Sequence, residues 1–169
     1  MPFTFTPIRE AEARQIALWR YEGAYAFYNG DAEDIEQIEA SVQSYLNPAY
    51  HYYSMRNESA ELIGYCCFGE DARVTGGDYS GNDREEALDV GVGMRPDLTG
   101  QGHGTAFMAA ILDFARHHFA PHTFRVTIAS WNNRALRLAQ KAGFQPEATF
   151  ISPSGTEFTI LTRKATIKF

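Results

Sequence analysis

The chain has 169 residues, of which 44% are hydrophobic and 21% charged, and its formal net charge is −6 at pH 7. These values are typical of one globular domain, and no apolar run approaches the roughly 18 residues of a membrane span. The net acidity disfavours nucleic-acid binding, which usually requires a basic face. The start of the chain lacks a secretory signal pattern. We therefore expect a single cytoplasmic domain over residues 1–169, with no membrane or nucleic-acid partner.

The charges are distributed unevenly along the chain. Acidic residues predominate before Arg95, and basic residues predominate from Arg95 onwards. This asymmetry is compatible with a polyanionic ligand on the second half and a cationic one on the first, although solvated surface charge explains it equally well. No residue spacing is typical of a metal site, so we expect no metal. The adjacent Cys66 and Cys67 are expected to be ordinary strand residues.

Hydrophobic periodicity predicts an alternation of helices and strands. In chain order these are helices 10–28 and 31–46, strands 51–56, 62–68 and 88–94, helix 102–119, strand 124–129, helix 134–142, and a hairpin of strands 148–152 and 157–162. Residues 69–84 are rich in Gly, Asp and Ser and are expected to form a long loop. This order predicts an α/β (α+β) fold, with a mixed sheet covered by helices. The unit from Leu88 to Ala129 should form a right-handed crossover and a parallel strand pair.

A glycine-rich turn joins the strand at 88–94 to the next helix. It consists of Gly100, Gln101, Gly102, His103, Gly104 and Thr105. The backbone amides of such a turn can converge on a phosphate, and the helix N-terminus adds positive potential. A Walker loop would need a lysine here, and a Rossmann turn would follow its strand without the intervening Arg-Pro-Asp segment. On these residues alone, an ordinary helix-start loop remains an equal alternative.

A second pattern follows the strand at 124–129. It begins at Asn132, has Ala135 three residues later, and ends in Lys141-Ala142-Gly143-Phe144. In order and separation, the two patterns together resemble the GNAT acetyltransferases. The glycine loop of that family reads Gln/Arg-x-x-Gly-x-Gly/Ala, and its later motif runs from Asn-x-x-Ala to Lys-x-Gly-Phe. The order of elements over nearly the whole chain fits as well, and the chain is similar to ribosomal-protein-alanine acetyltransferase-like members.

The resemblance implies a mixed, mostly antiparallel central sheet with helices on both faces. It also implies an N-acetyltransferase that moves an acetyl group from acetyl-CoA to a primary amine by direct attack. The backbone of Val92, Gly93 and Met94 would pair with the pantetheine arm. The loop from Gly100 to Thr105 would hold the pyrophosphate. Asn132 would bond to the cofactor, and could also cap the following helix.

The match has departures. Thr99 stands where the family usually has Gln or Arg. Ala139 occupies the position at which many members place a Tyr that protonates the leaving thiolate. Thr127 corresponds to the Glu base of the ribosomal-protein-alanine acetyltransferases. Neither catalytic side chain can therefore be transferred to this sequence.

Other residues are candidates for the chemistry. Asp89 is the first candidate base, because it lies on the central strand three residues before Val92, where many members carry Glu; a salt bridge is the equal alternative. Weaker candidates are Glu85 and Glu86 as bases, and Ser130 and His103 as acids.

The acceptor should lie near the first two helices and the long loop. An aromatic group there could be core, or could line an amine pocket; it comprises Trp19, Tyr21, Tyr25, Phe27 and Tyr28. We expect a small cationic amine or a protein N-terminus as acceptor. An acyl-CoA-binding regulatory or sensor module without turnover is the alternative, and a nucleotide-phosphate binder a remote third. Acceptor identity, acyl-chain preference and the choice between monomer and homodimer stay open.

Overall fold

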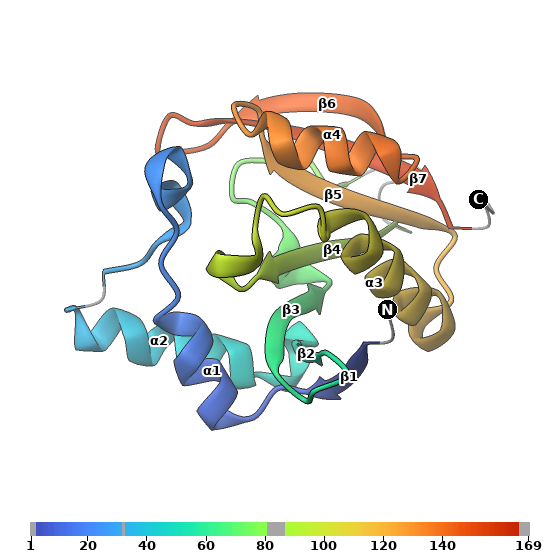
Figure 1. The fold of residues 1–169 in the computed structure, drawn as a ribbon. Coiled ribbons are helices and arrows are strands. Elements are labelled where there is room, and N and C mark those ends of the chain that lie inside the picture. Colours follow the sequence, from blue (N-terminus) through green and yellow to red (C-terminus); the bar gives the residue numbers. More distant parts are fainter. Residues whose placement is uncertain (1–2, 32, 81–86, 166–169) are drawn as a thin grey trace. The chain divides into compact units, whose positions relative to one another are not determined.

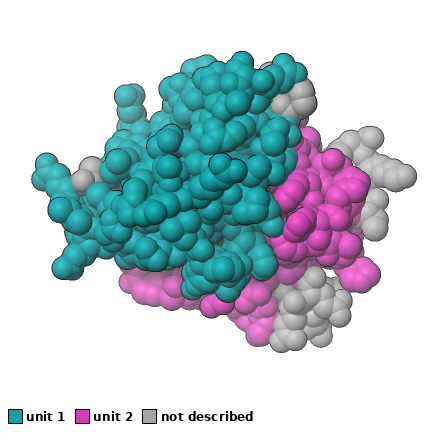
Figure 2. Space-filling view, turned by 90° about the horizontal axis from the view of Figure 1, so that it is seen from below, with its two compact units in different colours: residues 1–67, 92–103 teal, residues 68–91, 104–169 magenta. Residues whose placement is uncertain are grey.

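The computed structural model describes residues 3–31, 33–80 and 87–165. The chain divides into two compact units, shown in different colours in Figure 2. The first unit comprises residues 1–67 and 92–103, and the second comprises residues 68–91 and 104–169. The single domain over residues 1–169 stays a prediction. Within the described residues, no helix has the length and apolarity needed to cross a bilayer.

The first unit combines short antiparallel strands with two helices. Its elements are β1 (Thr4–Pro7), α1 (Glu10–Ala17), the 3-10 helix η1 (Gly23–Tyr28), α2 (Ile35–Leu46), η2 (Pro48–Tyr50), β2 (Tyr53–Arg56), β3 (Leu62–Phe68, of which Phe68 belongs to the second unit), the end of β4 (Val92–Met94) and η5 (Pro96–Leu98). β2 pairs antiparallel with both β1 and β3. Cys66 and Cys67 are strand residues as predicted, and both are buried.

The predicted first helix is too long. α1 ends at Ala17, where the Arg20 guanidinium donates to the Ala17 carbonyl at 3.0 Å. The chain then passes through Gly23 at φ 61°, outside the right-handed helical region. The apparent periodicity misled because Phe27 and Tyr28 are 45% and 47% exposed, so no single buried face runs through both segments. The strand β1, with only four residues, was missed.

The second unit carries the remaining strands. Its elements are η3 (Glu70–Ala72), the start of β4 (Ala87–Met94, up to Gly91), α3 (Gly104–Phe119), β5 (Thr123–Ala129), α4 (Asn133–Lys141), β6 (Gln145–Ile151) and β7 (Glu157–Lys164). The strand order is β4-β5-β7-β6 (Figure 1). β4 and β5 are parallel, as predicted, and the other two pairs are antiparallel. The described residues of the two units form seven strands in a mixed, mostly antiparallel arrangement, together with helices, which confirms the predicted α/β fold class.

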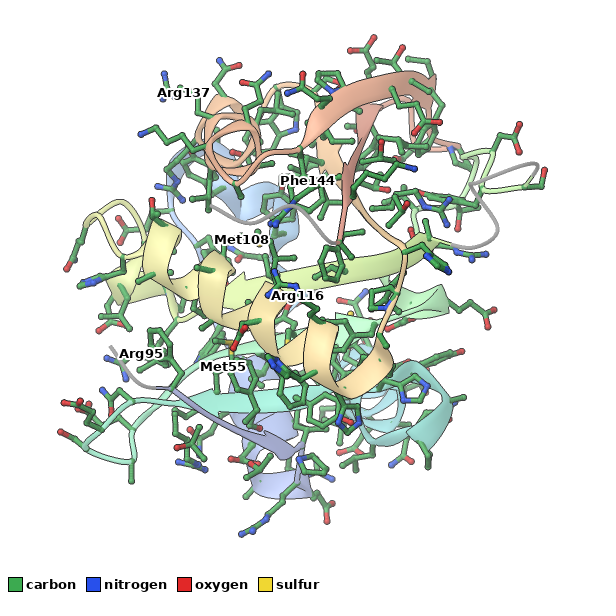
Figure 3. The ribbon with its side chains drawn as sticks, turned by 90° about the vertical axis from the view of Figure 1, so that its right-hand side faces the viewer. Met55, Arg95, Met108, Arg116, Arg137 and Phe144 are labelled. Carbon is green, nitrogen blue, oxygen red and sulfur yellow. The ribbon has the colours of Figure 1, made fainter. Side chains whose placement is uncertain are left out.

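The end of α4 explains the Lys-x-Gly-Phe pattern physically. Gly143 has φ 95°, which glycine adopts without steric cost. The chain therefore turns back, and the Phe144 amide donates to the Ala139 carbonyl at 3.0 Å in a Schellman-type cap. Phe144 is fully buried, and Met108 of α3 is 4% exposed (Figure 3). The motif thus ends a helix and anchors it in the core of the second unit.

Candidate functional site

The turn between β4 and α3 has the backbone that the glycine pattern predicts. Gly100 and Gly102 adopt φ 72° and 84°, values that favour glycine. Two side chains hold the turn from within. The Thr99 hydroxyl donates to the Pro96 carbonyl at 2.7 Å, and the Gln101 amide donates to the Asp97 carbonyl at 2.6 Å. Thr99, which replaces the family's longer residue, therefore braces the turn in this chain.

The third glycine of the pattern, Gly104, is required by packing against α4. Gly104 is the first residue of α3, and a Cβ built there would lie 3.1 and 3.2 Å from the two methyl carbons of Leu138 on α4. Such contacts are tighter than ordinary van der Waals packing, so a larger residue would force the Leu138 side chain to shift. Gly104 is thus explained by helix packing, independently of any ligand.

Asn132 begins α4 as a helix cap. Its side-chain oxygen accepts from the Ala135 amide at 3.1 Å, and the residue is 7% exposed. This arrangement satisfies one of the free amides of the first helical turn. The capping role weighed from the sequence is therefore confirmed, while cofactor binding by Asn132 stays a prediction.

The end of β4 offers backbone groups along one edge. The Arg95 amide donates to the Ile63 carbonyl of β3 at 2.8 Å. Because backbone groups alternate in direction along a strand, those of Val92 and Met94 point away from β3. The Tyr21 hydroxyl donates to the Met94 carbonyl at 2.7 Å. Burial and, to a smaller extent, the electrostatic effect of Tyr45 raise the pKa of Tyr21 to about 12. The hydroxyl therefore keeps its proton at neutral pH.

Gly93 lies directly against an aromatic side chain in the same unit. A Cβ at this position would come within 2.1 Å of the Tyr65 ring, which excludes every other residue type without rearrangement. Tyr65 also approaches Trp19 at 6.1 Å between ring centroids, and joins Tyr45 and Tyr52 at 6.0 and 6.1 Å. An aromatic group therefore covers this stretch of β4.

In the second unit, Asp89 of β4 is part of a buried ion pair. Its Oδ1 accepts from Arg125 Nε at 2.6 Å, and its Oδ2 accepts from Arg125 Nη2 at 2.7 Å and from Arg73 Nε at 2.8 Å. Asp89 and Arg125 are each 1% exposed. The salt bridge that the sequence left open is thus present. The role of Asp89 as a base stays a prediction, and the geometry favours an anchoring role, because protonation would weaken three charge-assisted hydrogen bonds.

The two parallel strands of this unit separate directly after the ion pair. Their register runs from Ala87↔Thr123 to Asp89↔Arg125, and no further β4–β5 pair forms among the described residues of the unit. β5 continues alone with β7 as far as Ala129. Thr127, next after Arg125 on the same face of β5, shares a 2.9 Å hydrogen bond with the Tyr79 hydroxyl. The ion pair therefore closes one end of a fork between the strands, and Thr127 lines one side of that fork.

Comparison with known proteins identifies the family. A family model described as an acetyltransferase (GNAT) domain matches residues 3–145. The chain belongs to the GNAT acetyltransferase family. As a GNAT acetyltransferase, it is an N-acetyltransferase, and its family uses an acyl-CoA cosubstrate.

Solved structures support the same fold for this GNAT acetyltransferase. A spermidine N-acetyltransferase chimera of Vibrio cholerae SpeG and hSSAT is 17% identical, with a TM-score of 0.73 and coverage of 98% of this chain and 97% of that one. The spermidine/spermine N-acetyltransferase SpeG from Vibrio cholerae, in complex with manganese ions, is 15% identical, with a TM-score of 0.68 and coverage of 97% and 93%. At these identities the likeness concerns the fold. No curated protein sequence matches the chain significantly.

The departures of this GNAT acetyltransferase from the family pattern have structural counterparts. Ala139 is fully buried on α4, so this position packs inside the second unit. Ser130, a candidate acid, shares a 2.7 Å hydrogen bond with the Thr159 hydroxyl. His103 lies half-buried in the turn before α3. The candidate bases Glu85 and Glu86 lie outside the described residues.

The aromatic group expected near the first helices is rearranged. Phe27 and Tyr28 contact each other edge to face at 5.1 Å and are largely exposed. Other aromatic contacts join half-buried Trp19 to Tyr65, and Tyr65 to the tyrosines of α2 and of the segment before β2. Sequence reasoning missed Tyr65 because it lies within the apolar run of β3 and gave no signal of its own. It also missed Arg73 and Arg125, whose contact with Asp89 joins distant segments.

Proposed function

We propose that the chain transfers an acetyl group from acetyl-CoA to a primary amine of a small molecule or of a protein N-terminus. The observation that carries the proposal is the turn before α3, where Gly100 and Gly102 hold left-handed φ values. Such a backbone exposes consecutive amides to an anion, and the start of a 16-residue helix follows at once. These φ values and the adjacent helix start support the proposal that the turn binds a pyrophosphate.

Three groups of residues would hold the cofactor. The backbone of Val92, Gly93 and Met94 would pair with its extended arm, since the groups of Val92 and Met94 point away from β3. The turn from Gly100 to Thr105 would take the pyrophosphate, and Asn132 would add a side-chain contact. When bound, acetyl-CoA supplies an acyl group activated as a thioester.

The chain's own groups would then assist the transfer. The amine has to arrive neutral and close to the acyl carbon, which is mainly a matter of positioning. Its proton would leave to a base or to water. Asp89 is the candidate from the sequence, although its two arginine partners favour an anchoring role. A backbone amide near Met94 would stabilise negative charge developing on the acyl oxygen.

A second candidate function is an acyl-CoA-binding regulatory or sensor module without turnover. Two observations favour it. Ala139 supplies no acid at the family's usual position and is fully buried. The carboxylate of Asp89 is already occupied by three hydrogen bonds. Such a module would bind the cofactor but release no CoA on addition of amines.

Thermal unfolding with acetyl-CoA, CoA and ATP tests cofactor binding. At about a hundred times the dissociation constant, a ligand of the native state stabilises by about 2.7 kcal/mol, which corresponds to roughly 5–11 °C for a chain of this size. Both CoA compounds should raise the melting temperature and ATP should not. No rise with either CoA compound on a folded sample contradicts the proposal.

A matched pair of variants locates the binding site. Gly102→Asp places a negative charge in the turn and should abolish the rise. Gly155→Asp is the control, because Gly155 also has a positive φ, 90° against 84°, and also has open space where a Cβ would lie. The control should lose similar stability but keep the response to CoA. Amine-dependent release of free CoA then separates the enzyme from the sensor module.

A further inference from the structure

Within the first unit, the side chain of Tyr65 reaches from β3 across the end of β4. The Arg95 amide donates to the Ile63 carbonyl at 2.8 Å, so the two strands are neighbours here. Two residues along each strand, in opposite directions, Tyr65 stands opposite Gly93. The ring atoms nearest to the Cβ position of Gly93 are Cε1, Cζ and Oη, at 2.1, 2.4 and 2.7 Å. The hydroxyl end of the ring therefore lies over β4, and the missing side chain of Gly93 makes this approach possible.

This hydroxyl is directed toward the backbone edge that is proposed to pair with the cofactor. Neighbouring strands lie about 4.7–4.9 Å apart, and the Tyr65 ring spans that gap from the side of β3. Its outer end thus leads toward the opposite edge of β4, where the backbone groups of Val92 and Met94 point. Val92 is 40% exposed, so this end of the strand is accessible. Tyr65 and residues 92–94 belong to the same unit.

Three aromatic rings hold the Tyr65 ring in this position. Its centroid lies 6.1 Å from that of Trp19, 6.0 Å from that of Tyr45 and 6.1 Å from that of Tyr52. Aromatic rings at such separations attract each other. Tyr65 is half-buried, so part of its side chain can still meet a ligand. The ring is therefore both restrained and reachable.

The direction of the chain determines which part of the cofactor would meet this hydroxyl. β4 runs from Ala87 to Met94, and the glycine turn follows it. An arm that starts at a pyrophosphate in the turn and pairs along β4 would pass Met94 first and Val92 later. Its thioester, at the far end from the pyrophosphate, would thus lie on the side of Gly93 and Tyr65.

We propose that Tyr65 is a catalytic residue that gives its hydroxyl proton to the departing sulfur. The inference rests on the proposed function. A departing thiolate gains from a positioned proton donor, and Ala139, at the family's usual position for one, is fully buried and has no polar group. A phenol delivered from β3 over Gly93 would supply that donor from another element of the fold.

The step balances in atoms and charge. The neutral amine forms a bond to the acetyl carbonyl carbon as the carbon–sulfur bond breaks. Tyr65 gives one proton to the sulfur, and the proton that the nitrogen loses returns to the Tyr65 oxygen through water. The products are an N-acetylated amine and CoA, and no group is oxidised or reduced.

Replacing Tyr65 by phenylalanine removes the hydroxyl but keeps the ring over Gly93. We expect kcat for CoA formation from acetyl-CoA and an amine to fall about 100-fold or more, as for loss of a general acid. The dissociation constant of acetyl-CoA should stay within about threefold of the natural value, since the lost interaction belongs to the transition state. Tyr52→Phe is the matched control, because Tyr52 belongs to the same aromatic group and contacts the Tyr65 ring. The control should keep the natural kcat, and melting temperatures show whether both variants are folded.

Fluorine NMR detects the contact without turnover. A fluorinated tyrosine, which keeps both ring and hydroxyl, is placed at position 65 and, in a second chain, at position 52. The fluorine resonance at position 65 should shift on binding of CoA, and much less on binding of a CoA analogue that lacks the sulfur atom. At position 52 the two ligands should have the same effect.

The possible outcomes separate this role from the proposed function. A natural kcat in Tyr65→Phe, an equal loss in Tyr52→Phe, or equal shifts at position 65 with both ligands overturns the role of Tyr65 alone. If the natural chain forms no CoA with any amine, the proposed function and this role fail together.

Discussion

Replacing Asp89 by asparagine separates its two possible roles. The substitution removes the carboxylate that holds Arg125, and both residues are 1% exposed. Because the Arg125 charge would remain buried without the Asp89 carboxylate, we expect a loss of about 3–5 kcal/mol. For a chain of 169 residues, each kcal/mol lowers the melting temperature by roughly 2–4 °C. The expected fall is therefore roughly 6–20 °C.

Differential scanning calorimetry measures this directly, with urea unfolding as a second estimate. Asp113→Asn is the control, since Asp113 also pairs with an arginine of the second unit but its side chain is 64% exposed. An exposed pair contributes about 0–1 kcal/mol, so the control should melt close to the natural chain.

The result that refutes the anchoring role is an Asp89→Asn variant that melts within about 2 °C of the natural chain. If that variant also binds acetyl-CoA but no longer forms free CoA from it when an amine is added, Asp89 is the base predicted from the sequence. A large fall in melting temperature with residual turnover indicates that Asp89 anchors the fold and is not the base. In that case the proton leaves by another route, such as water.

Two further substitutions test the first unit. Gly93→Ala should lower the free energy of unfolding by about 1–3 kcal/mol through overpacking against Tyr65. The shift of the urea midpoint caused by Gly93→Ala should be smaller in a Tyr65→Leu background. Additive losses in the double variant contradict the contact. Tyr21→Phe should cost about 1 kcal/mol at pH 7 through loss of the bond to the Met94 carbonyl. The folded pKa of Tyr21, about 12, lies above its unfolded value, so the natural chain should lose about 2 kcal/mol between pH 10 and 12 that the variant keeps. Parallel stability curves of the two chains over that range contradict the burial of Tyr21.

Much of the chain from β4 onwards was predictable from the sequence, because its signals are local. The glycine turn, the cap at Asn132 and the end of α4 at Gly143 each depend on a few neighbouring residues with defined backbone preferences. The parallel pair followed from the strand–helix–strand order. The family then followed from two local patterns in the right order.

The rest depended on register and on distant contacts. Asp89 and Arg125 are 36 positions apart, and only the register of β4 on β5 brings them together. The sequence predicted that these strands pair but not which residues face each other. In the same way, nothing local indicated that Tyr79 would reach Thr127, or that Tyr65 would cover Gly93. The prediction of where the first helix ends was wrong for a related reason, since periodicity alone does not reveal which face is buried.

The short parallel register between β4 and β5 has a consequence for how the chain folds. It consists of three residue pairs, closed by an ion pair between segments that α3 separates. Closing a loop of this length costs entropy before the contact forms, whereas β6 and β7 are joined by a tight turn and can pair early. We therefore expect the Asp89→Asn variant to unfold faster while refolding at nearly the natural rate. In stopped-flow measurements, a slowed refolding phase would instead place the fork in the folding nucleus.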